Sequence, residues 1–434
     1  MGRKMKDSGV DWIGEIPEDW EIGRLKNVCS INGRIGFRGY TQDDIVDKGE
    51  GAISLSPSNI SDSSMTYEKC TYISWKKYDE SPEIKISDED IVMVKTGSSY
   101  GKCMMVKNLP QQATINPQLV VIRNKEIENK YLEFVLQSAV IQHQIETVVS
   151  GGTIPTMTQH DMYNFYLPIP TREIQKRISL ILFQKISAIN KTKEDIMVSI
   201  DKYKSLKQSL ITRAVTKGVR GKREMKDSGI EWIGEIPADW DVTRIKFLFE
   251  LRNERNFLPL EEVNLISLYT DKGVIQHDDL EKTTGNKASN ADGYKIVCKN
   301  DIVVNIILCW MGAIGRSAYE GVTSPAYDVY IPNADVDSRF YHHYFRTTGF
   351  NGDCYKRGKG IMAMRWRTYA EQFRDIKVVH PSMEEQQEIL RYLDEKCSAI
   401  DTLIAKKEQL LSELETYKKS LIYEYVTGKR EVPA

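Results

Sequence analysis

The sequence lacks the patterns that several classes of protein require. Its seven cysteines are scattered and form no C-x-x-C pair, which argues against a disulfide framework and a zinc site and favours reduced thiols. No stretch approaches the roughly 18 consecutive apolar residues of a membrane helix. The polar start, Met1–Asp7, has no apolar signal-peptide core. We therefore expect a cytoplasmic protein that does not enter a membrane.

An excess of charge of one sign is also missing. Sixty Lys and Arg residues face 61 Asp and Glu residues, for a net charge of −1. Because the overall field is close to neutral, any binding to nucleic acid has to come from local basic patches. The 434 residues exceed one ordinary core and predict about two to three domains. The composition, 41% hydrophobic and 28% charged, excludes wholesale disorder.

The usual catalytic and metal-binding motifs are absent as well. The loop Gly97–Cys103 has three residues between its first two glycines instead of the four of a phosphate loop, and Cys103 replaces the magnesium-binding Ser or Thr. Asn116-Pro117-Gln118 lacks the second proline and the aromatic residue of an amino-methyltransferase motif. His342-His343 has no partner at metal-ligand spacing. We therefore expect no metal site and no catalytic activity in this chain alone.

An internal repeat is the most informative feature that is present. Residues 5–20 read MKDSGVDWIGEIPEDW and residues 225–240 read MKDSGIEWIGEIPADW, with 13 of 16 positions identical. The period of 220 residues is far too long for a solenoid repeat. It indicates that a whole domain and its connector were duplicated.

The interiors of the two copies agree in pattern only. An apolar run after an acidic residue occurs at Asp90–Val94 and again at Asp301–Asn305, which suits a buried strand. Asn116-Pro117 has a weaker counterpart in Ser324-Pro325. Short β-rich segments between Gly, Ser, Asn and Asp predict a mixed α+β domain in each copy. A shared framework around a diverged interior is expected if both copies do the same job on different targets.

Each copy ends in a long helical segment that follows a proline. Neither glycine nor proline occurs from Arg172 to Val215 or from Met383 to Val426. Eleven positions from 390 to 425, spaced by steps of three and four, hold nine apolar or aromatic residues, and the positions 211 earlier hold eight. This 3.5-residue seam is typical of a left-handed coiled coil, although a helix packed on its own domain is the alternative.

Charge indicates how the two helices pair. Residues 171–217 contain 11 basic and 4 acidic residues, whereas residues 382–426 contain 6 and 10. One helix of each kind attract each other, so we expect an antiparallel pair within one chain. This arrangement predicts a pseudo-twofold repeat with one domain at each end of the pair and neighbouring termini. The predicted domains are residues 1–168 and 225–380. The predicted helices are residues 169–217 and 381–427, with a linker at 218–224 and a tail at 428–434.

Basic and hydroxyl-rich loops are the candidate nucleic-acid contacts. The segment after Tyr355 combines cations with glycines and an aromatic residue, at Lys356, Arg357, Lys359, Arg365, Trp366 and Arg367. Such cations neutralise phosphates, and arginine can also bind guanine bidentately; a solvated charged loop is the alternative. The equivalent segment of the first copy, 151–159, is hydroxyl-rich and almost uncharged. Weaker candidates in loop-like contexts are Arg34, Arg38, Lys95, Lys102, Arg252, Arg255 and Arg316.

These features together resemble the specificity subunit of type I restriction–modification systems. The W-I-G-E-I-P-x-D-W motif, the D-I-V strand before a Gly/Ser loop, L-P-I-P before E-x-Q-x-x-I and the closing coiled coil carry the resemblance over essentially the whole chain. The resemblance implies two target-recognition domains, each reading one half of an asymmetric, interrupted DNA sequence. It implies that the helices act as a spacer and dock two methylation subunits, which restriction subunits join. S-adenosylmethionine, ATP and magnesium then belong to those partners.

The resemblance also implies which loops contact double-stranded DNA. In the first copy these are the Gly/Ser loop and the segment before the last helix, with candidates Thr96, Ser98, Ser99, Tyr100, Lys102, Thr153, Thr156, Thr158 and Gln159. In the second copy the segment Arg357–Arg367 takes this place. Its register against the first copy is open, because it is basic where small polar residues are usual.

Two functions of other classes compete with this reading. A coiled-coil scaffold whose domains bind protein predicts no salt-dependent affinity for DNA. A self-contained methyltransferase predicts methyl transfer by the purified chain without partners. The predicted seam of 36 residues spans about 54 Å at ~1.5 Å per residue, enough to straddle half-sites one helical turn apart, about 34–36 Å. We therefore favour a non-catalytic DNA-recognition subunit.

Overall fold

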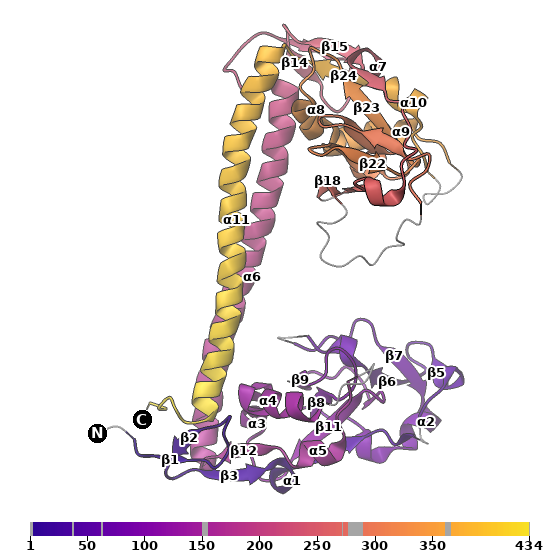
Figure 1. Ribbon diagram of the computed structural model, residues 1–434. Helices are drawn as coiled ribbons and strands as arrows, with labels where there is room; N and C mark the ends of the chain where they lie inside the picture. Colours follow the sequence, from indigo (N-terminus) through magenta and orange to yellow (C-terminus); the bar gives the residue numbers. More distant parts are fainter. Residues whose placement is uncertain are drawn as a thin grey trace. The chain divides into compact units, whose positions relative to one another are not determined.

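The chain folds into two units, each built from one copy of the repeat and part of both long helices. The computed structural model describes residues 3–36, 39–61, 64–149, 155–270, 272–276, 290–360 and 366–433. The first unit comprises Met1–Met197 with Glu408–Ala434, and the second comprises Val198–Lys407. Each unit mixes short strands, short helices and part of the helix pair (Figure 1). This confirms the predicted α+β class.

The repeated motif forms the same hairpin and turn in both units. In the first unit β1 (Met5–Asp7) pairs antiparallel with β2 (Glu15–Pro17), and in the second β13 (Met225–Asp227) pairs with β14 (Glu235–Pro237) in the same register. The tryptophan that closes each motif is fully buried, with Trp20 and Trp240 both 0% exposed. The motif therefore anchors the hydrophobic core of its unit.

A four-stranded antiparallel sheet is the common centre of both domains. The first has the order β4-β11-β8-β9 and the second β16-β23-β20-β21. Three of the inner strands, β8, β11 and β20, begin with runs of apolar residues that are buried on both faces of the sheet. The bounds are Cys29–Gly33, Leu119–Asn124, Ile91–Val94 and Cys103–Met105 in the first unit, and Phe249–Leu251, Tyr327–Pro332, Ile302–Asn305 and Ile314–Arg316 in the second. The duplication thus extends through the diverged interior.

A second layer of strands differs between the copies. The first unit has a mixed sheet in the order β10 (Ala113–Ile115), β6 (Gly51–Leu55), β7 (Thr71–Ser74) and β5 (Ile45–Val46), with a core of its own. In the second unit two antiparallel strand pairs are described instead: β17 (Ile266–Tyr269) with β18 (Gly273–Gln276), and β19 (Lys295–Val297) with β22 (Gly321–Thr323). The divergence of the sequence is therefore also structural.

Short helices and a closing strand pair complete each domain. The strand pairs are β3 (Glu21–Arg24) with β12 (Tyr166–Ile169), and β15 (Asp241–Arg244) with β24 (Lys377–His380). The helices are α1 (Leu25–Val28), α2 (Trp75–Asp79), α3 (Asn129–Gln137), α4 (Ala139–Val148) and α5 (Gln159–Tyr163), then α7 (Ile245–Leu248), α8 (Ser338–Phe345), α9 (Thr348–Arg357) and α10 (Ala370–Arg374). Turns of 3₁₀ helix include η7 (Cys309–Met311).

The two long helices pair antiparallel along the predicted seam. Helix α6 spans Arg172–Lys217 and α11 spans Met383–Val426. In the first unit Lys193 Nζ lies 2.5 Å from Glu415 Oε2, and in the second Lys207 Nζ lies 2.7 Å from Asp401 Oδ2. A later residue of α6 thus pairs with an earlier residue of α11. Seam residues such as Leu182, Ile200, Leu393 and Leu421 are buried, so the predicted coiled-coil periodicity is confirmed.

The described helices include none that is long and apolar enough to cross a membrane. All seven cysteines are free thiols.

Candidate nucleic-acid interface

Two predicted loops of the first domain are joined into one surface. The loop between β8 and β9 and the segment before α5 are held together by main-chain hydrogen bonds. Met157 N donates to Lys95 O at 2.9 Å, and Gly97 N donates to Pro155 O at 3.1 Å. Thr96 and Thr156 also form an isolated bridge. Residues about 60 positions apart in the chain therefore act as a single site.

Polar side chains converge beside the end of strand β4. A Cβ added at Gly33 would lie 2.7 Å from Gln159 Nε2, so glycine lets this amide approach the strand closely, and Lys95 Nζ is also nearby, 3.6 Å from the same point. Burial lowers the pKa of the Lys95 ammonium. A partly desolvated cation of this kind is stabilised by an approaching anion such as phosphate.

Gln118 belongs to this surface although the sequence did not single it out as a contact. Its main-chain oxygen accepts a hydrogen bond from Lys95 N at 2.8 Å, and its exposed side chain accepts one from Asn116 Nδ2 at 3.1 Å. The side-chain NH₂ lies near Gly97. The signal in the sequence is the segment Asn116-Pro117-Gln118, which is an incomplete match to an amino-methyltransferase motif. Glutamine can bind adenine bidentately in the major groove.

The remaining predicted residues of these loops divide by environment. Ser98 is exposed, whereas Tyr100 packs against the core of the unit. Thr158 caps α5, because its hydroxyl accepts a hydrogen bond from Asp161 N at 3.1 Å. Ser99 and Lys102 lie on the same loop.

Several predicted cations are instead bound inside their own domains. Arg34 is only 4% exposed, and its guanidinium donates to Ile115 O at 3.1 Å and to Thr114 Oγ1 at 3.2 Å. Arg252 binds Asp301 at 2.9 and 3.1 Å. Charge in a loop-like sequence does not reveal such burial, and we leave both residues out of the proposed interface.

Arg316 and Arg255 also have internal acceptors. The Arg316 guanidinium donates to Asn300 Oδ1 at 2.9 and 2.7 Å, and Arg255 Nη1 donates to Gly293 O at 3.1 Å. Three further predicted residues, Arg38, Thr153 and Arg365, lie outside the residues that the structure describes.

The basic segment of the second domain occupies the place equivalent to Pro155–Gln159. Thr368 N donates to Ile306 O at 2.9 Å, as Met157 N does to Lys95 O. Both residues of this pair lie 211 positions after their counterparts. The hydrogen bond settles the register that the sequence left open and places Arg367 opposite Thr156.

The structure separates the cations of this segment into two kinds. Lys359 and Arg367 are exposed and bridged by two main-chain hydrogen bonds of 2.8 and 3.0 Å. No side-chain hydrogen bond or ion pair joins either of them to another described residue. Lys356 Nζ lies 2.7 Å from Glu231 Oε2, and Arg357 Nη1 lies 3.1 Å from Asp375 Oδ2. Lys359 and Arg367 are therefore the cations of this segment that are available to bind phosphate.

An aromatic stack supports this surface. The ring centroids of Tyr355 and Trp366 are 5.1 Å apart, and those of Trp310 and Tyr355 are 5.6 Å apart. Trp366 Nε1 donates to Tyr355 O at 3.0 Å, and Gly358 leaves room for the indole. Trp366 thus stacks on Tyr355. Trp310 and Tyr355 were not predicted, because only the fold brings them to Trp366.

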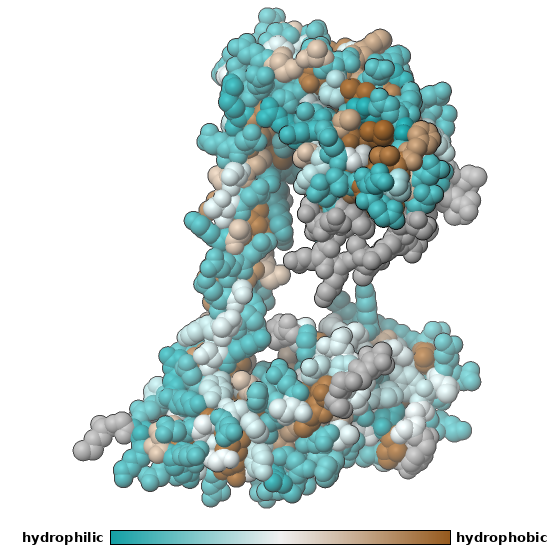
Figure 2. Space-filling view, in the orientation of Figure 1, coloured by the Kyte–Doolittle hydropathy of each residue, from teal (hydrophilic) through white to brown (hydrophobic). Residues whose placement is uncertain are grey.

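The loops equivalent to Thr96–Lys102 differ in chemistry between the domains. The second domain has Ile307–Ala313 there, and Leu308 and Met311 are 38% and 51% exposed. Exposed apolar side chains of this domain are visible in Figure 2. The first surface thus presents hydroxyl, amide and amine groups, whereas the second presents apolar groups and the cations Lys359 and Arg367. Neither surface brings together three or more potential metal ligands among the described residues.

Comparison with known proteins identifies the family. Residues 17–197 and 237–416 each match the family described as the type I restriction modification DNA specificity domain. This chain belongs to that family. The two matches coincide with the two copies of the repeat, so each copy is one specificity domain. The chain is accordingly a DNA specificity subunit of a type I restriction–modification enzyme, a family of recognition components and not of catalysts.

Relatives of the specificity family cover nearly the whole chain. The putative type I restriction enzyme MjaX specificity subunit of Methanocaldococcus jannaschii is 26% identical and covers 97% of this chain and 96% of its own. The MjaVIII specificity subunit of the same organism is 23% identical over 96% and 94%.

Two solved structures share this fold. One, from work on complex assembly and conformational transition of the type I R-M system, has a TM-score of 0.70 at 14% identity, over 96% of this chain and 99% of that one. The HsdS subunit from Thermoanaerobacter tengcongensis has a TM-score of 0.50 at 16% identity, over 96% and 98%.

Proposed function

We propose that each specificity domain reads one half of an asymmetric, interrupted DNA sequence. The observation that carries this proposal is the pairing of two loops at equivalent places in both domains, through Met157–Lys95 and Thr368–Ile306. The frame of the site is thus shared, while the side chains on it differ. Two domains that recognise different half-sites need the same backbone arrangement and different side chains at the contact surface.

The residues of the first surface suit base edges more than phosphates. Gln118 and Gln159 carry amides that can pair with adenine, and Ser98 can donate or accept at a base edge. Lys95 supplies the cation for a nearby phosphate. Thr96, Ser99, Lys102 and Thr156 lie on the same two loops and complete the proposed contact surface.

The second surface combines free cations with apolar groups. Arg367 is the proposed base-reading residue, because a guanidinium can bind guanine bidentately. Lys359 is the proposed phosphate contact, because lysine acts as a compact point charge. Trp366 holds this segment through its stack on Tyr355. Lys356 and Arg357 would have to exchange an acidic partner for a phosphate, so we assign them smaller contributions.

The partners of the chain follow from its role in the enzyme. We propose that the helix pair docks two methylation subunits and sets the spacing between half-sites, and that restriction subunits join this complex in the cytoplasm. S-adenosylmethionine, ATP and magnesium would be held by those partners. Two features support this: the sequence has no motif for these cofactors, and both copies carry the same helical seam.

Site mapping in the assembled complex tests the proposal. The chain is co-expressed with a candidate methylation subunit, and the modified adenines are mapped across a genome. We expect methylation at one interrupted, asymmetric sequence whose two parts change independently when either specificity domain is exchanged. Methylation without sequence preference, or an unchanged pattern in both exchanges, would favour a scaffold role instead.

A further inference from the structure

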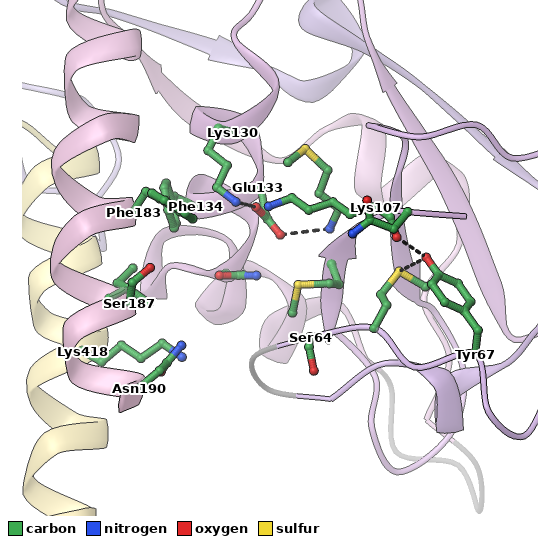
Figure 3. Close-up of a pocket in the computed structure, with 16 residues that line it drawn as sticks. Ser64, Tyr67, Lys107, Lys130, Glu133, Phe134, Phe183, Ser187, Asn190 and Lys418 are labelled. Atoms are coloured by element: carbon green, nitrogen blue, oxygen red, sulfur yellow. Dashed lines mark hydrogen bonds and ion pairs between the residues drawn. The ribbon is translucent and has the colours of Figure 1, made fainter. Parts of the chain in front are cut away.

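A cleft within the first unit lies away from the proposed DNA contacts. It has a volume of about 460 Å³ and is lined by α3, the end of β9, the Phe183–Asn190 face of α6 and Lys418 of α11 (Figure 3). The DNA-contact loop precedes β9, whereas Lys107 of the cleft follows it. The cleft is therefore at the other end of this strand.

Positive charge is in excess in this cleft. Lys107, Lys130 and Lys418 line it together with one carboxylate, Glu133. The Glu133 carboxylate is already engaged, because it accepts a hydrogen bond from Met105 N at 2.9 Å and lies 3.0 Å from Lys130 Nζ. Lys418 also affects Glu415. Burial alone would raise the pKa of the Glu415 carboxyl, but the hydrogen bond from Lys193 and the charge of Lys418 lower it.

Two of the ammonium groups are neighbours. Lys107 Nζ and Lys130 Nζ lie 5.8 and 5.3 Å from the centroid of the Phe183 ring, which is 49% exposed. Burial and the adjacent Lys130 ammonium lower the pKa of Lys107. Like charges held together in a partly desolvated place are stabilised by a bound anion.

The second unit shows how the same place is neutralised from within. Its helix α11 is offset by 211 from α6, since Gln175 and Gln386 donate to the carbonyls of Pro170 and Pro381 in the same way, at 2.8 and 2.9 Å. By this offset Asp401 takes the place of Asn190. Asp401 binds Lys207 at 2.7 Å, and Lys207 is the counterpart of Lys418.

A second carboxylate of the second unit has no equivalent in the first. Asp394 stands at the position of Phe183. Burial lowers the pKa of the half-buried His343, and the charge of Asp394 opposes this lowering. The first unit therefore replaces two carboxylates of the helix by an aromatic ring and an amide. An external anion would restore the charge balance that Asp394 and Asp401 provide in the second unit.

We propose that this cleft binds a small phosphate-bearing molecule. Its phosphate would lie between the neighbouring ammonium groups of Lys107 and Lys130, because compact ammonium groups are common phosphate ligands. Lys418, which lies beside Asn190 on the other side of the cleft, would add to the positive charge (Figure 3). Its nonpolar body would contact the exposed ring of Phe183 and the neighbouring Phe134. The volume is within the range of small-molecule sites, roughly 300–1,000 Å³. Binding would tie the specificity domain to the helix pair within this unit, independently of the DNA contacts.

Ligand binding to the purified full chain tests this proposal. The probes are adenosine monophosphate, inorganic phosphate and adenosine, measured by thermal unfolding and by calorimetric titration. We expect adenosine monophosphate to raise Tm in a saturable way, phosphate to raise it less, and adenosine to leave it unchanged. The Lys107→Gln variant should weaken binding of adenosine monophosphate by about 10-fold or more, since a charged hydrogen bond is lost.

Two further variants make the result specific. Asn190→Asp places a carboxylate where the second unit has Asp401, so it should weaken phosphate binding without lowering Tm in the absence of ligand. Lys185→Gln removes an exposed charge of the same helix outside the cleft and should leave binding unchanged. Equal losses in Lys185→Gln and Lys107→Gln, or no saturable binding at millimolar concentrations, would overturn the proposal. An altered salt dependence of DNA binding in Lys107→Gln would assign these lysines to DNA.

Discussion

The salt dependence of DNA binding should separate the free cations of the second domain from the paired ones. Lys359 and Arg367 have exposed side chains with no ion pair to another described residue, whereas Lys356 lies 2.7 Å from Glu231. To contact a phosphate, a lysine that already has a carboxylate partner must give up that ion pair, which reduces its net gain by the value of the pair, about 0–1 kcal/mol at the surface. The perturbation is therefore Lys359→Ala or Arg367→Ala, with Lys356→Ala as the matched control.

The magnitude follows from counterion release. Each lost phosphate contact should reduce the magnitude of the slope of log K against log salt by ~0.9. Between 50 and 200 mM salt, a fourfold change, this slope difference corresponds to about 3.5-fold in affinity for one contact and about 12-fold for two. If Arg367 reads a base, its loss should also cost about 1–3 kcal/mol on the cognate site and relax the preference at one base pair.

The assay is a salt titration of DNA binding by the assembled complex, on the cognate site and on a site changed at one base pair. We expect reduced slopes for Lys359→Ala, a lost base preference for Arg367→Ala and a slope close to the parent for Lys356→Ala. Unchanged slopes and preference in both test variants would refute the reasoning. The uncharged loops would then be left as the readers of DNA.

Four other perturbations test the architecture. Exchanging residues 21–165 for the matching segment of a relative should change one half of the methylated sequence and keep its spacing; a change in both halves would contradict two independent readers. Joining the termini and reopening the chain near Gly218–Gly221 should preserve solubility and methylation, and an insoluble permutant beside a tolerated insertion at the same place would argue against it. Inserting a heptad into α6 alone should misalign its ion pairs with α11 and lower Tm, which matched insertions in both helices should not. Trp20→Ala should reduce the free energy of unfolding by about 3–5 kcal/mol in denaturant titrations, since Trp20 is 0% exposed; a loss below 1 kcal/mol would show that the motif is peripheral.

The framework could be predicted because it is local or periodic in sequence. The repeated motif around Trp20 and Trp240 pairs strands that are close together in the chain. The seam of α6 and α11 is a regular pattern, and the two helices have opposite charge balances. The strands beginning after Asp90 and Asp301 follow from apolar runs. Each of these features depends on neighbours that are close in the chain or on a constant spacing, which sequence reasoning can detect.

The interface was harder to predict because it depends on contacts across the fold. Lys95 and Met157 meet only after the sheet and α5 are in place, and so do Trp310 and Tyr355. Charge alone pointed to Arg34, whose environment is an interior of carbonyl and hydroxyl acceptors. The composition of a loop records which groups are available, but only tertiary structure decides which of them face solvent.

One ion pair shows that the duplicated frame is maintained by its geometry and not by particular residues. In the first domain Asp90 accepts a hydrogen bond from Ser87 N at 3.0 Å and binds Arg123 of β11 at 3.1 Å. In the second domain Asp301 accepts one from Cys298 N at 2.7 Å and binds Arg252, which follows β16, at 2.9 Å.

The arginine of this pair thus comes from different strands in the two copies, while the aspartate and the turn that it caps stay the same. A buried carboxylate needs a cation, because its charge is costly without one. The strand that supplies the cation can change as long as the guanidinium reaches the turn. The loops next to these strands differ in the same way. They carry hydroxyl groups in the first domain and cations and apolar side chains in the second, while the strands keep the same pairing. A specificity subunit can in this way acquire a new half-site without rebuilding the domain that presents it.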